Sequence, residues 1–408
     1  MDILPILSTL RRHKITALLI VLEIALSCAI VCNAVFLISQ RLHRMDMPSG
    51  VAMHELVQVQ VATIGEQPDS RARTQEDLAA LQRIPGVQSV TLTNQLPFTN
   101  SSWNSSLKLT PTQTQPTLNT TIYRGEHVLQ TLGARLVAGR FFGPDEYVYY
   151  EDIQRDPTSA PRSSLIAIVT QGLAHRLWPG ESALGKTIYL GKIPLRVVGV
   201  VAGLIRPSLS NGDNTAQWSV VLPLRMSLGG GGNYVLRTAP AERQRVIQAT
   251  VTALKKLDPK RVITKQRTLD DARAEFFQSD RAMTGLLLGV IVALLLVTGL
   301  GIVGLASFWV AQRRRTIGVR RALGATRVDI MRYFQTENFL LATLGIALGM
   351  ALAYGINLLL MLNYELPRLP WMYFPIGAIA LWLIGQAAVL GPAVRAAAVP
   401  PVVATRTV

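Results

Sequence analysis

The chain has 408 residues, and its 41 Lys and Arg against 25 Asp and Glu give a formal net charge of +16. Hydrophobic residues make up 49% of it, and its mean hydropathy is +0.30. These values exclude an ordinary soluble domain and a protein buried wholly in a membrane, so we expect a few spans plus a sizeable soluble part. Because much of the basic excess flanks apolar runs, where the positive-inside rule places it, no nucleic-acid partner is expected.

The N-terminal region predicts an amphipathic segment followed by a first span. Residues 1–14 (MDILPILSTLRRHK) combine aliphatic side chains with a basic end, which is typical of an interfacial helix on the inner leaflet. Residues 15–39 are mostly apolar and long enough to cross a hydrocarbon core of ~30 Å at ~1.5 Å per residue. This run is too long for the core of a secretory signal, and no small-x-small cleavage site follows it. We therefore predict an uncleaved first transmembrane helix.

The first span contains one acidic residue and two cysteines. Glu23 is costly in lipid, so its carboxylate is predicted to face protein or water. It forms either a polar contact to a neighbouring helix, such as the one carrying Gln386, or a possible intramembrane site for a substrate or proton. Cys28 and Cys32 share one helical face and are predicted to pack, because nothing else in the chain completes a disulfide framework or a metal cluster.

Residues 40–280 contain no further span and predict a large α+β domain inserted between the first and second transmembrane helices. Two β-α-β pieces, about 50–134 and 211–267, are predicted to pair into one split subdomain. The intervening residues, about 135–210, are predicted to form an inserted second subdomain. The Ser-, Thr-, Asn- and Gln-rich stretch 99–121 is predicted to be an irregular loop or a long hairpin. The clearest strand patterns cover 55–63, 87–93, 165–169, 195–201, 216–222, 233–237 and 261–266.

Three more spans complete the predicted fold, an integral membrane protein with four transmembrane helices. A polar helix at 268–280 leads without a breaker into an apolar run, so residues 281–310 are predicted to be a second span continuing outward as a stalk. Residues 311–335 are predicted to form a helical hairpin at the membrane surface. The third and fourth spans are expected at 336–362 and 371–393, followed by a tail at 394–408.

The distribution of arginine predicts the orientation. The loop between the second and third spans carries Arg313, Arg314, Arg315, Arg320, Arg321, Arg327 and Arg332, whereas the loop between the third and fourth carries Arg368 alone. The positive-inside rule therefore predicts cytoplasmic N- and C-termini, with residues 40–280 on the opposite side of the membrane. In a bacterium this places the large domain in the periplasm and the chain in the inner membrane.

Two glycine-rich motifs imitate nucleotide-binding sites. The segment from Gly180 to Thr187 (GESALGKT) matches the P-loop pattern, but a β-hairpin pattern follows it where a P-loop requires a helix. The segment from Gly299 to Gly304 matches G-x-G-x-x-G inside the second span, where small residues allow close helix packing. The histidines are scattered, and no catalytic arrangement is evident. We expect a non-catalytic chain with no cofactor or metal of its own.

The basic segment between the second and third spans is the strongest candidate for function. Ile317, Val319 and Leu323 make it amphipathic as well as basic, and Gly318 and Gly324 suit a tight helix–turn–helix. The arginines alone would be explained by the orientation rule or by binding to anionic lipid. Neither explanation accounts for the apolar face or the glycines, so we predict that a protein partner docks here.

This segment, RRRTIGVRRALGATRVDIMRYFQTENFLLATLGIALG, resembles the signature of the FtsX/MacB superfamily of ABC transporter permeases, R-x-x-E-I-G-[IV]-R-[RK]-A-[LV]-G-A. The family motif is matched at Gly318, Arg320, Arg321, Ala322, Leu323, Gly324 and Ala325. Thr316 stands where the family pattern has Glu, which removes one acidic contact that the pattern would supply. In the soluble region, LQTLGARLVAGRFF and VTQGLAHRLWPGESALGKTIYLGKIPLRVVGVV are similar to the MacB-type periplasmic core domain.

The resemblance implies a permease subunit that uses the work of a separate cytoplasmic ATPase, which would bind ATP and Mg²⁺ and dock on the seven matched residues. The chain shows no fused ATPase domain. It would form a homodimer or pair with a sister permease, and would pass motion to its periplasmic domain (mechanotransmission). A periplasmic adaptor and an outer-membrane channel would complete an efflux or export complex. The alternative is an FtsX-like signalling subunit that controls a cell-wall hydrolase without transport. The substrate is not identified by the resemblance.

Overall fold

The computed structural model describes residues 14–63, 69–100, 102–156, 161–209, 215–229, 231–364 and 368–399. These residues form two compact units, one of Met1–Asp46 with Ser279–Val408 and one of Met47–Gln278. The interfacial helix predicted at 1–14 lies outside the described residues except for Lys14, and so does most of the predicted tail.

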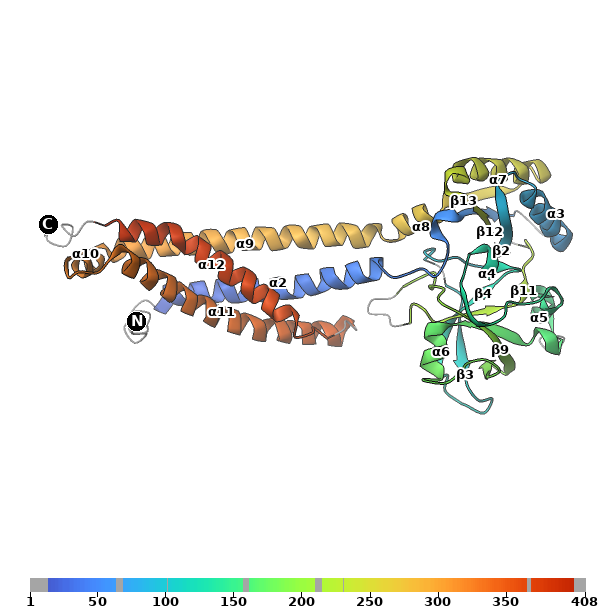
Figure 1. The fold of residues 1–408 in the computed structure, drawn as a ribbon, viewed down its shortest axis with the longest axis horizontal. Helices are drawn as coiled ribbons and strands as arrows, with labels where there is room; N and C mark the ends of the chain where they lie inside the picture. Colours follow the sequence, from blue (N-terminus) through green and yellow to red (C-terminus); the bar gives the residue numbers. More distant parts are fainter. Residues whose placement is uncertain are drawn as a thin grey trace. The chain divides into compact units, whose positions relative to one another are not determined.

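The first unit contains four helices that are long and apolar enough to cross a membrane (Figure 1). They are α2 (Lys14–Met45), α9 (Gln278–Gln312), α11 (Arg327–Tyr364) and α12 (Tyr373–Ala397). The prediction of four apolar helices is confirmed. The first three extend beyond the predicted runs at both ends, whereas α12 begins two residues later and ends four residues later than predicted. The third is much longer than expected, because α11 begins within the predicted hairpin at Arg327 and needs no separate connecting helix.

Helices α2 and α11 pack closely because small residues face each other. A Cβ atom added at Gly349 would lie 2.5 Å from the Cβ of Cys28 and 2.6 Å from the carbonyl oxygen of Ala25. Further along, Asn33 donates from Nδ2 to the carbonyl oxygen of Ala353 over 3.2 Å. Small residues that let backbones approach are a common basis of helix association in membranes. Cys28 lies in this interface, whereas Cys32 lies against Gly377 of α12. Both are buried free thiols, in agreement with the predicted packing role.

We expect Gly349→Leu to disrupt the bundle, because the new side chain would meet the backbone of α2. Overpacking of this kind costs about 1–3 kcal/mol or more. Gly355→Leu on the same helix is the matched control, since a Cβ there would meet no described atom within 4 Å. Fluorescence-detected size exclusion after detergent extraction measures the fraction of folded protein. Equal recovery of the two variants would contradict the close contact between α2 and α11.

The second unit contains a four-stranded antiparallel sheet in the order β13-β1-β12-β2 (Figure 1). Its core lies between the sheet and two helices and contains Val59, Leu81, Leu236 and Val246. The strands are β1 (Leu56–Ala62), β2 (Val87–Thr93), β12 (Gly231–Thr238) and β13 (Val262–Thr268), and the helices are α3 (Ser70–Gln82) and α7 (Arg243–Leu257).

A seven-stranded sheet in the order β5-β9-β7-β10-β4-β3-β8 forms the other part of this unit. An additional pairing of β8 with β9 closes all of these strands except β5 into a ring. Leu107, Ile122, Val169, Ile188 and Val220 lie in its core. The strands are β3 (Asn104–Lys108), β4 (Leu118–Arg124), β5 (Leu136–Gly139), β7 (Ile166–Thr170), β8 (Thr187–Leu190), β9 (Ile193–Val201) and β10 (Ser219–Leu222).

Short elements accompany the two sheets of this unit. They are η1 (Met53–Glu55), α4 (Val128–Thr131), η2 (Pro144–Glu146), α5 (Tyr150–Arg155), η3 (Arg162–Ser164), α6 (Gln171–Leu177), η4 (Pro240–Glu242) and a parallel pair, β6 (Val148–Tyr149) with β11 (Leu224–Arg225).

The predicted subdomain boundaries differ from the two sheets. The prediction placed residues up to 134 and from 211 in the split subdomain, but β3, β4 and β10 belong to the seven-stranded sheet. The reason is that β4 pairs with β10 in parallel, with Ile122 opposite Val220, across almost a hundred residues of sequence. The apolar pattern of a strand indicates that it is a strand but does not indicate its partner. The stretch 99–121 does contain a hairpin, formed by β3 and β4.

The expectation of one unbroken helix from residue 268 into the second span is wrong. Helix α8 (Leu269–Phe276) begins at a capping box formed by Thr268 and Asp271, and Phe277 then interrupts it before α9 begins at Gln278. Phe277 is 2% exposed, and its ring lies 5.7 Å from that of Phe98. Local helix propensity favours one continuous helix, but the burial of the Phe277 ring determines the backbone conformation at this position.

Candidate functional site

The basic segment folds into a helical hairpin, as predicted. Helix α10 (Arg314–Ala322) ends in a turn, and α11 follows at Arg327. Gly324 has a φ of +100°, a left-handed conformation that favours glycine, which closes the first helix. Thr326 and Asp329 cap the second helix reciprocally, since the Asp329 N–H donates to Thr326 Oγ1 over 3.2 Å and the Thr326 N–H donates to Asp329 Oδ2 over 3.0 Å.

The tip of this hairpin exposes apolar side chains among basic ones. Leu323 is 83% exposed, while Val319 and Val328 are 43% and 48% exposed. Val319 and Leu323 are four residues apart and therefore lie on one face at the end of α10. We call Val319, Ala322, Leu323, Gly324 and Val328 the apolar tip. The exposed side chains of Arg314, Arg315 and Arg327 accompany it in the hairpin. Such a surface is suited to an acidic-rimmed apolar groove on another protein.

Several of the predicted coupling residues have contacts within the chain. Gly318 is buried on the inner face of α10. Arg320 places its guanidinium 4.7 Å from the ring centre of Tyr333. Arg321 donates from Nη1 to the carbonyl oxygens of Ala397 (3.1 Å) and Val399 (2.8 Å), which are at the end of α12. The structure thus brings the seven predicted residues together, but the exposed part is Ala322, Leu323 and Gly324, with Ala325 half-buried.

A buried ion pair next to the hairpin was missed in the sequence. Arg313 donates from Nη1 to both carboxylate oxygens of Glu337, at 3.1 and 3.0 Å. Their side chains are 11% and 1% exposed. The Arg313 guanidinium also lies 5.3 Å from the ring centre of Trp309. The available signal was an acidic residue within an apolar span, which is costly unless it is paired.

Glu23 contacts a different helix from the one suggested by its sequence. A Cβ atom added at Gly301 would lie 2.3 Å from Glu23 Oε1, so the glycine of α9 provides space for this carboxylate. Gln386, the suggested partner, donates instead to the carbonyl oxygen of Gln335 over 3.4 Å. The G-x-G-x-x-G pattern in α9 therefore serves close packing at Gly301. A role for Glu23 as a substrate or proton site stays a prediction.

The P-loop-like segment is a structural turn. It follows helix α6, and the hairpin of β8 and β9 comes directly after it, so both neighbours of a true P-loop are absent from this position. Lys186 Nζ donates to Glu181 Oε2 within the same turn. Gly180 and Gly185 have φ of +77° and +78°, which the turn requires.

Lys186→Ala is accordingly expected to leave ATP binding and ATP turnover unchanged. The ion pair with Glu181 is largely exposed to solvent, and such pairs contribute little to stability. The measurements are binding of radiolabelled ATP to the purified chain and ATP turnover by the chain together with the separate ATPase that the resemblance implies. A loss of turnover comparable with that of a true P-loop lysine variant would restore the nucleotide-binding interpretation.

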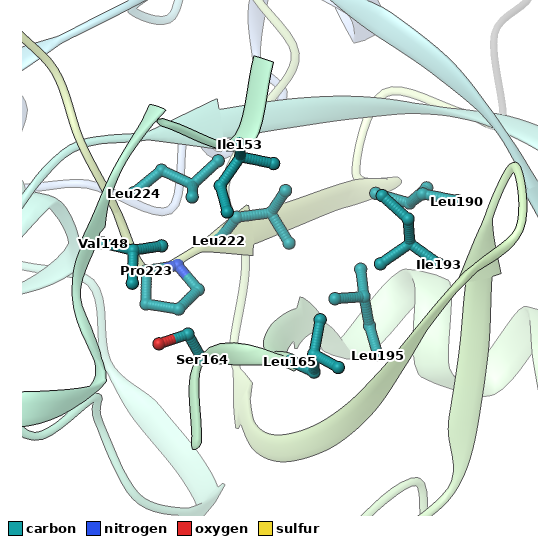
Figure 2. Close-up of a pocket in the computed structure, with 10 residues that line it drawn as sticks. All are labelled: Val148, Ile153, Ser164, Leu165, Leu190, Ile193, Leu195, Leu222, Pro223 and Leu224. Atoms are coloured by element: carbon teal, nitrogen blue, oxygen red, sulfur yellow. The ribbon is translucent and has the colours of Figure 1, made fainter. Parts of the chain in front are cut away.

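An apolar hollow lies between strands β8, β9 and β10 of the seven-stranded sheet and the neighbouring pair β6 and β11 (Figure 2). Its volume is about 70 Å³, which is too small for a drug-sized molecule. Ser164 supplies the one hydroxyl group of the labelled lining, and its Oγ has no hydrogen-bond partner. The hollow is a local packing defect of this core. Its lining residues are Val148, Ile153, Ser164, Leu165, Leu190, Ile193, Leu195, Leu222, Pro223 and Leu224. Within the described ranges, no group of His, Cys, Asp and Glu could hold a metal ion.

Two family models match the chain and together cover most of it. Residues 16–262 match the MacB-like periplasmic core domain, and residues 288–401 match the FtsX-like permease C-terminal region. The first match spans more than half of the chain. The chain belongs to the MacB-like ABC transporter permeases. This MacB-like permease is an inner-membrane protein, in keeping with its four apolar helices.

Curated relatives of this MacB-like permease are export proteins. The pyoverdine export ATP-binding/permease protein PvdT of Pseudomonas putida is 28% identical over 253 residues, which are 56% of this chain and 38% of that protein. A macrolide export ATP-binding/permease protein MacB of Shewanella sp. is 27% identical over 306 residues, 72% of this chain and 42% of that protein. The MacB-like permease therefore spans about two fifths of the length of these relatives.

Among solved structures, the periplasmic region of MacB from Actinobacillus actinomycetemcomitans is 16% identical to this MacB-like permease. The match covers 55% of this chain and 94% of that chain, with a TM-score of 0.32.

Proposed function

We propose that this chain is the membrane subunit of an ABC exporter, in which an ATP-binding protein docks on the apolar tip of the hairpin. The observation that carries this proposal is the exposure of Leu323 and its apolar neighbours at the end of α10, directly between two long apolar helices. At 83% exposure in a capped turn, the Leu323 side chain packs little against the part of the chain that the structure describes. It is the kind of anchor that fits an apolar pocket on a partner.

The ATP and Mg²⁺ of this exporter bind to the ATP-binding protein, and the hairpin receives its movement. Because the turn at Gly324 joins α10 directly to α11, a displacement of the tip acts on a helix that is long enough to cross the membrane. The soluble unit, Met47–Gln278, is bounded in sequence by α2 and α9. Movement of these helices would therefore be passed to both ends of that unit, which is the mechanotransmission expected from the resemblance.

The orientation follows from charge. The hairpin carries seven arginines, so the positive-inside rule places it in the cytoplasm together with both termini, and the soluble unit in the periplasm. There the soluble unit would engage a periplasmic adaptor and an outer-membrane channel. A second copy of this chain or a sister permease would complete the membrane part. The export class is favoured because the curated relatives are named for pyoverdine and macrolide export.

The test is co-expression of the tagged chain with candidate ATP-binding proteins, followed by pull-down and measurement of ATP turnover with and without a candidate adaptor. We expect one ATP-binding protein to copurify and its turnover to rise when the adaptor is present. If turnover responds to a cell-wall hydrolase and not to an adaptor, the FtsX-like signalling alternative replaces export. If no ATP-binding protein is captured, the proposed function is wrong.

A further inference from the structure

The ion pair between Arg313 and Glu337 is the most buried charged contact of the membrane unit's hairpin end. Removing two charges from water is costly, and their attraction in a low-dielectric interior offsets this cost only when both partners are present. Such a pair adds little net stability, yet loss of one partner is destabilising because it removes the charge that compensates the other. This behaviour suits a contact that fixes the relative position of two helices rather than one that strengthens the fold.

The position of Arg313 in the chain makes this contact specific. Arg313 is the residue between α9 and α10, with a φ of −99° and a ψ of 9°. Its N–H donates to the carbonyl oxygen of Trp309 over 3.0 Å, and its own carbonyl oxygen accepts from the Ile317 N–H over 3.0 Å. The backbone hydrogen bonds therefore run from α9 through this joint into α10. Glu337 lies about three turns into α11.

Helix α9 is exposed along most of its length, and its buried residues Ile302, Ala306 and Trp309 lie toward the hairpin end, where they pack in the core of the helical unit. In the most apolar part of α9, 17% of the residues are buried, against 56% in the corresponding part of α2. Polar contacts fasten it to α2 farther from the hairpin, where Thr298 Oγ1 lies 2.7 Å from Ser27 Oγ and Asp280 lies 2.5 Å from Arg41. At the hairpin end, the ion pair joins it to α11, which is itself packed closely on α2.

The cavity beside the Arg313–Glu337 pair is too small to hold a substrate. A cavity of about 10 Å³ is lined by Trp309, Glu337 and Asn338 together with aliphatic side chains. This volume is at the lower limit for a single water molecule. The buried carboxylate is therefore not explained by ligand binding, and its contact with Arg313 remains the feature that requires a function.

We propose that Arg313 and Glu337 are positioning residues whose ion pair fastens the joint between α9 and α10 to α11, so that the hairpin, α9 and α11 move together. The source of that movement rests on the proposed function, an ATP-binding protein at the apolar tip. The rigidity of the joint does not depend on the ATP-binding protein. The rigidity can therefore be tested in the chain alone, and the transmission of movement with the partner bound.

The first test measures the joint in the chain alone, in lipid nanodiscs, by double electron–electron resonance. Spin labels are attached at Val319→Cys on α10 and Leu344→Cys on α11, in a background carrying Cys28→Ala and Cys32→Ala. Both labelled positions are exposed, at 43% and 60%. The variants are Arg313→Gln, Glu337→Gln and the exchange of Arg313→Glu with Glu337→Arg. Arg315→Gln is the matched control, because it removes the same charge from an exposed position two residues away.

The wild type and Arg315→Gln are expected to give one narrow distance distribution. Arg313→Gln and Glu337→Gln are expected to broaden it, and the exchanged pair is expected to narrow it again. Arg313→Lys, which keeps the charge but loses the planar guanidinium, is expected to be intermediate and guards against variants that fail to insert. A distribution that is unchanged in Glu337→Gln, or an exchanged pair as broad as the single variants, would overturn the proposal.

The second test measures transmission. The Glu337→Gln variant is expected to copurify with the ATP-binding protein as the wild type does. The stimulation of ATP turnover by the permease is expected to fall about tenfold, which is the size typical of coupling between contacting residues. The exchanged pair should recover much of it. Wild-type stimulation in Glu337→Gln would overturn the positioning role. Failure of the wild type to capture any ATP-binding protein would instead refute the proposed function, while the distance measurement would still decide the joint.

Discussion

Leu323→Asp is expected to abolish copurification of the ATP-binding protein while leaving the chain folded in the membrane. Leu323 is 83% exposed, so its replacement removes little packing among the described residues. Placing a carboxylate in an apolar pocket of the partner would cost about 2–4 kcal/mol or more, the range of interface hot spots. Because each 1.4 kcal/mol is a factor of ten in affinity, binding would weaken by about thirtyfold to a thousandfold. Pull-down and titration in detergent measure this loss.

The matched control is Leu257→Asp, the same substitution at another exposed leucine, at the end of α7 in the soluble unit. It is expected to bind the partner as the wild type does. Arg321→Glu is a poorer test, because Arg321 also holds the carbonyl oxygens at the end of α12. Undiminished copurification of the Leu323→Asp variant would show that the apolar tip is not the docking surface.

Asp77→Ala is expected to cause the largest loss of stability in the soluble unit. Asp77 accepts from Arg261 Nη1 over 2.8 Å and from the Tyr234 hydroxyl over 2.5 Å. The side chains of Asp77 and Arg261 are 2% and 3% exposed, and burial together with the nearby carboxylate raises the pKa of Tyr234. Removing the carboxylate strands the Arg261 charge, which costs about 3–5 kcal/mol. For a unit of this size the melting temperature would fall by about 10 °C.

Asp152→Ala provides the comparison within the same unit. Asp152 pairs with Arg71 at 2.5 Å, but their side chains are 42% and 40% exposed, so the loss should be about 0–1 kcal/mol. Thermal unfolding followed by tryptophan fluorescence measures both variants. Equal melting temperatures for the two variants would show that the buried network around Asp77 does not contribute as described.

The spans and the hairpin were predictable because their signals are local. A long apolar run must become a helix in lipid, since every backbone group needs an internal partner. The glycine at 324 indicated the turn that its φ of +100° confirms. The role of the hairpin residues in docking stays a prediction. Their exposed fractions restrict the proposed docking surface to the apolar tip.

Features that depend on distant partners could not be predicted. The parallel pairing of β4 with β10, the interruption at Phe277 and the contact of Glu23 with Gly301 each join segments far apart in sequence. A strand pattern, an aromatic residue or a buried acid indicates that the residue has a contact elsewhere in the fold, but it does not indicate which residue makes that contact. Glu337 lay within a predicted span and carried such a signal, and its partner Arg313 became evident only from the fold.

The central claim, that an ATP-binding protein docks on the apolar tip, is tested most directly by site-specific cross-linking in native membranes. A photoreactive phenylalanine analogue replaces Leu323, and a second chain carries it at Leu257 as the control. The proposed function predicts a covalent product between position 323 and an ATP-binding protein, identified by mass spectrometry, and no such product from position 257. Cross-links from position 323 to lipid alone, in cells that contain the ATP-binding protein, would contradict it.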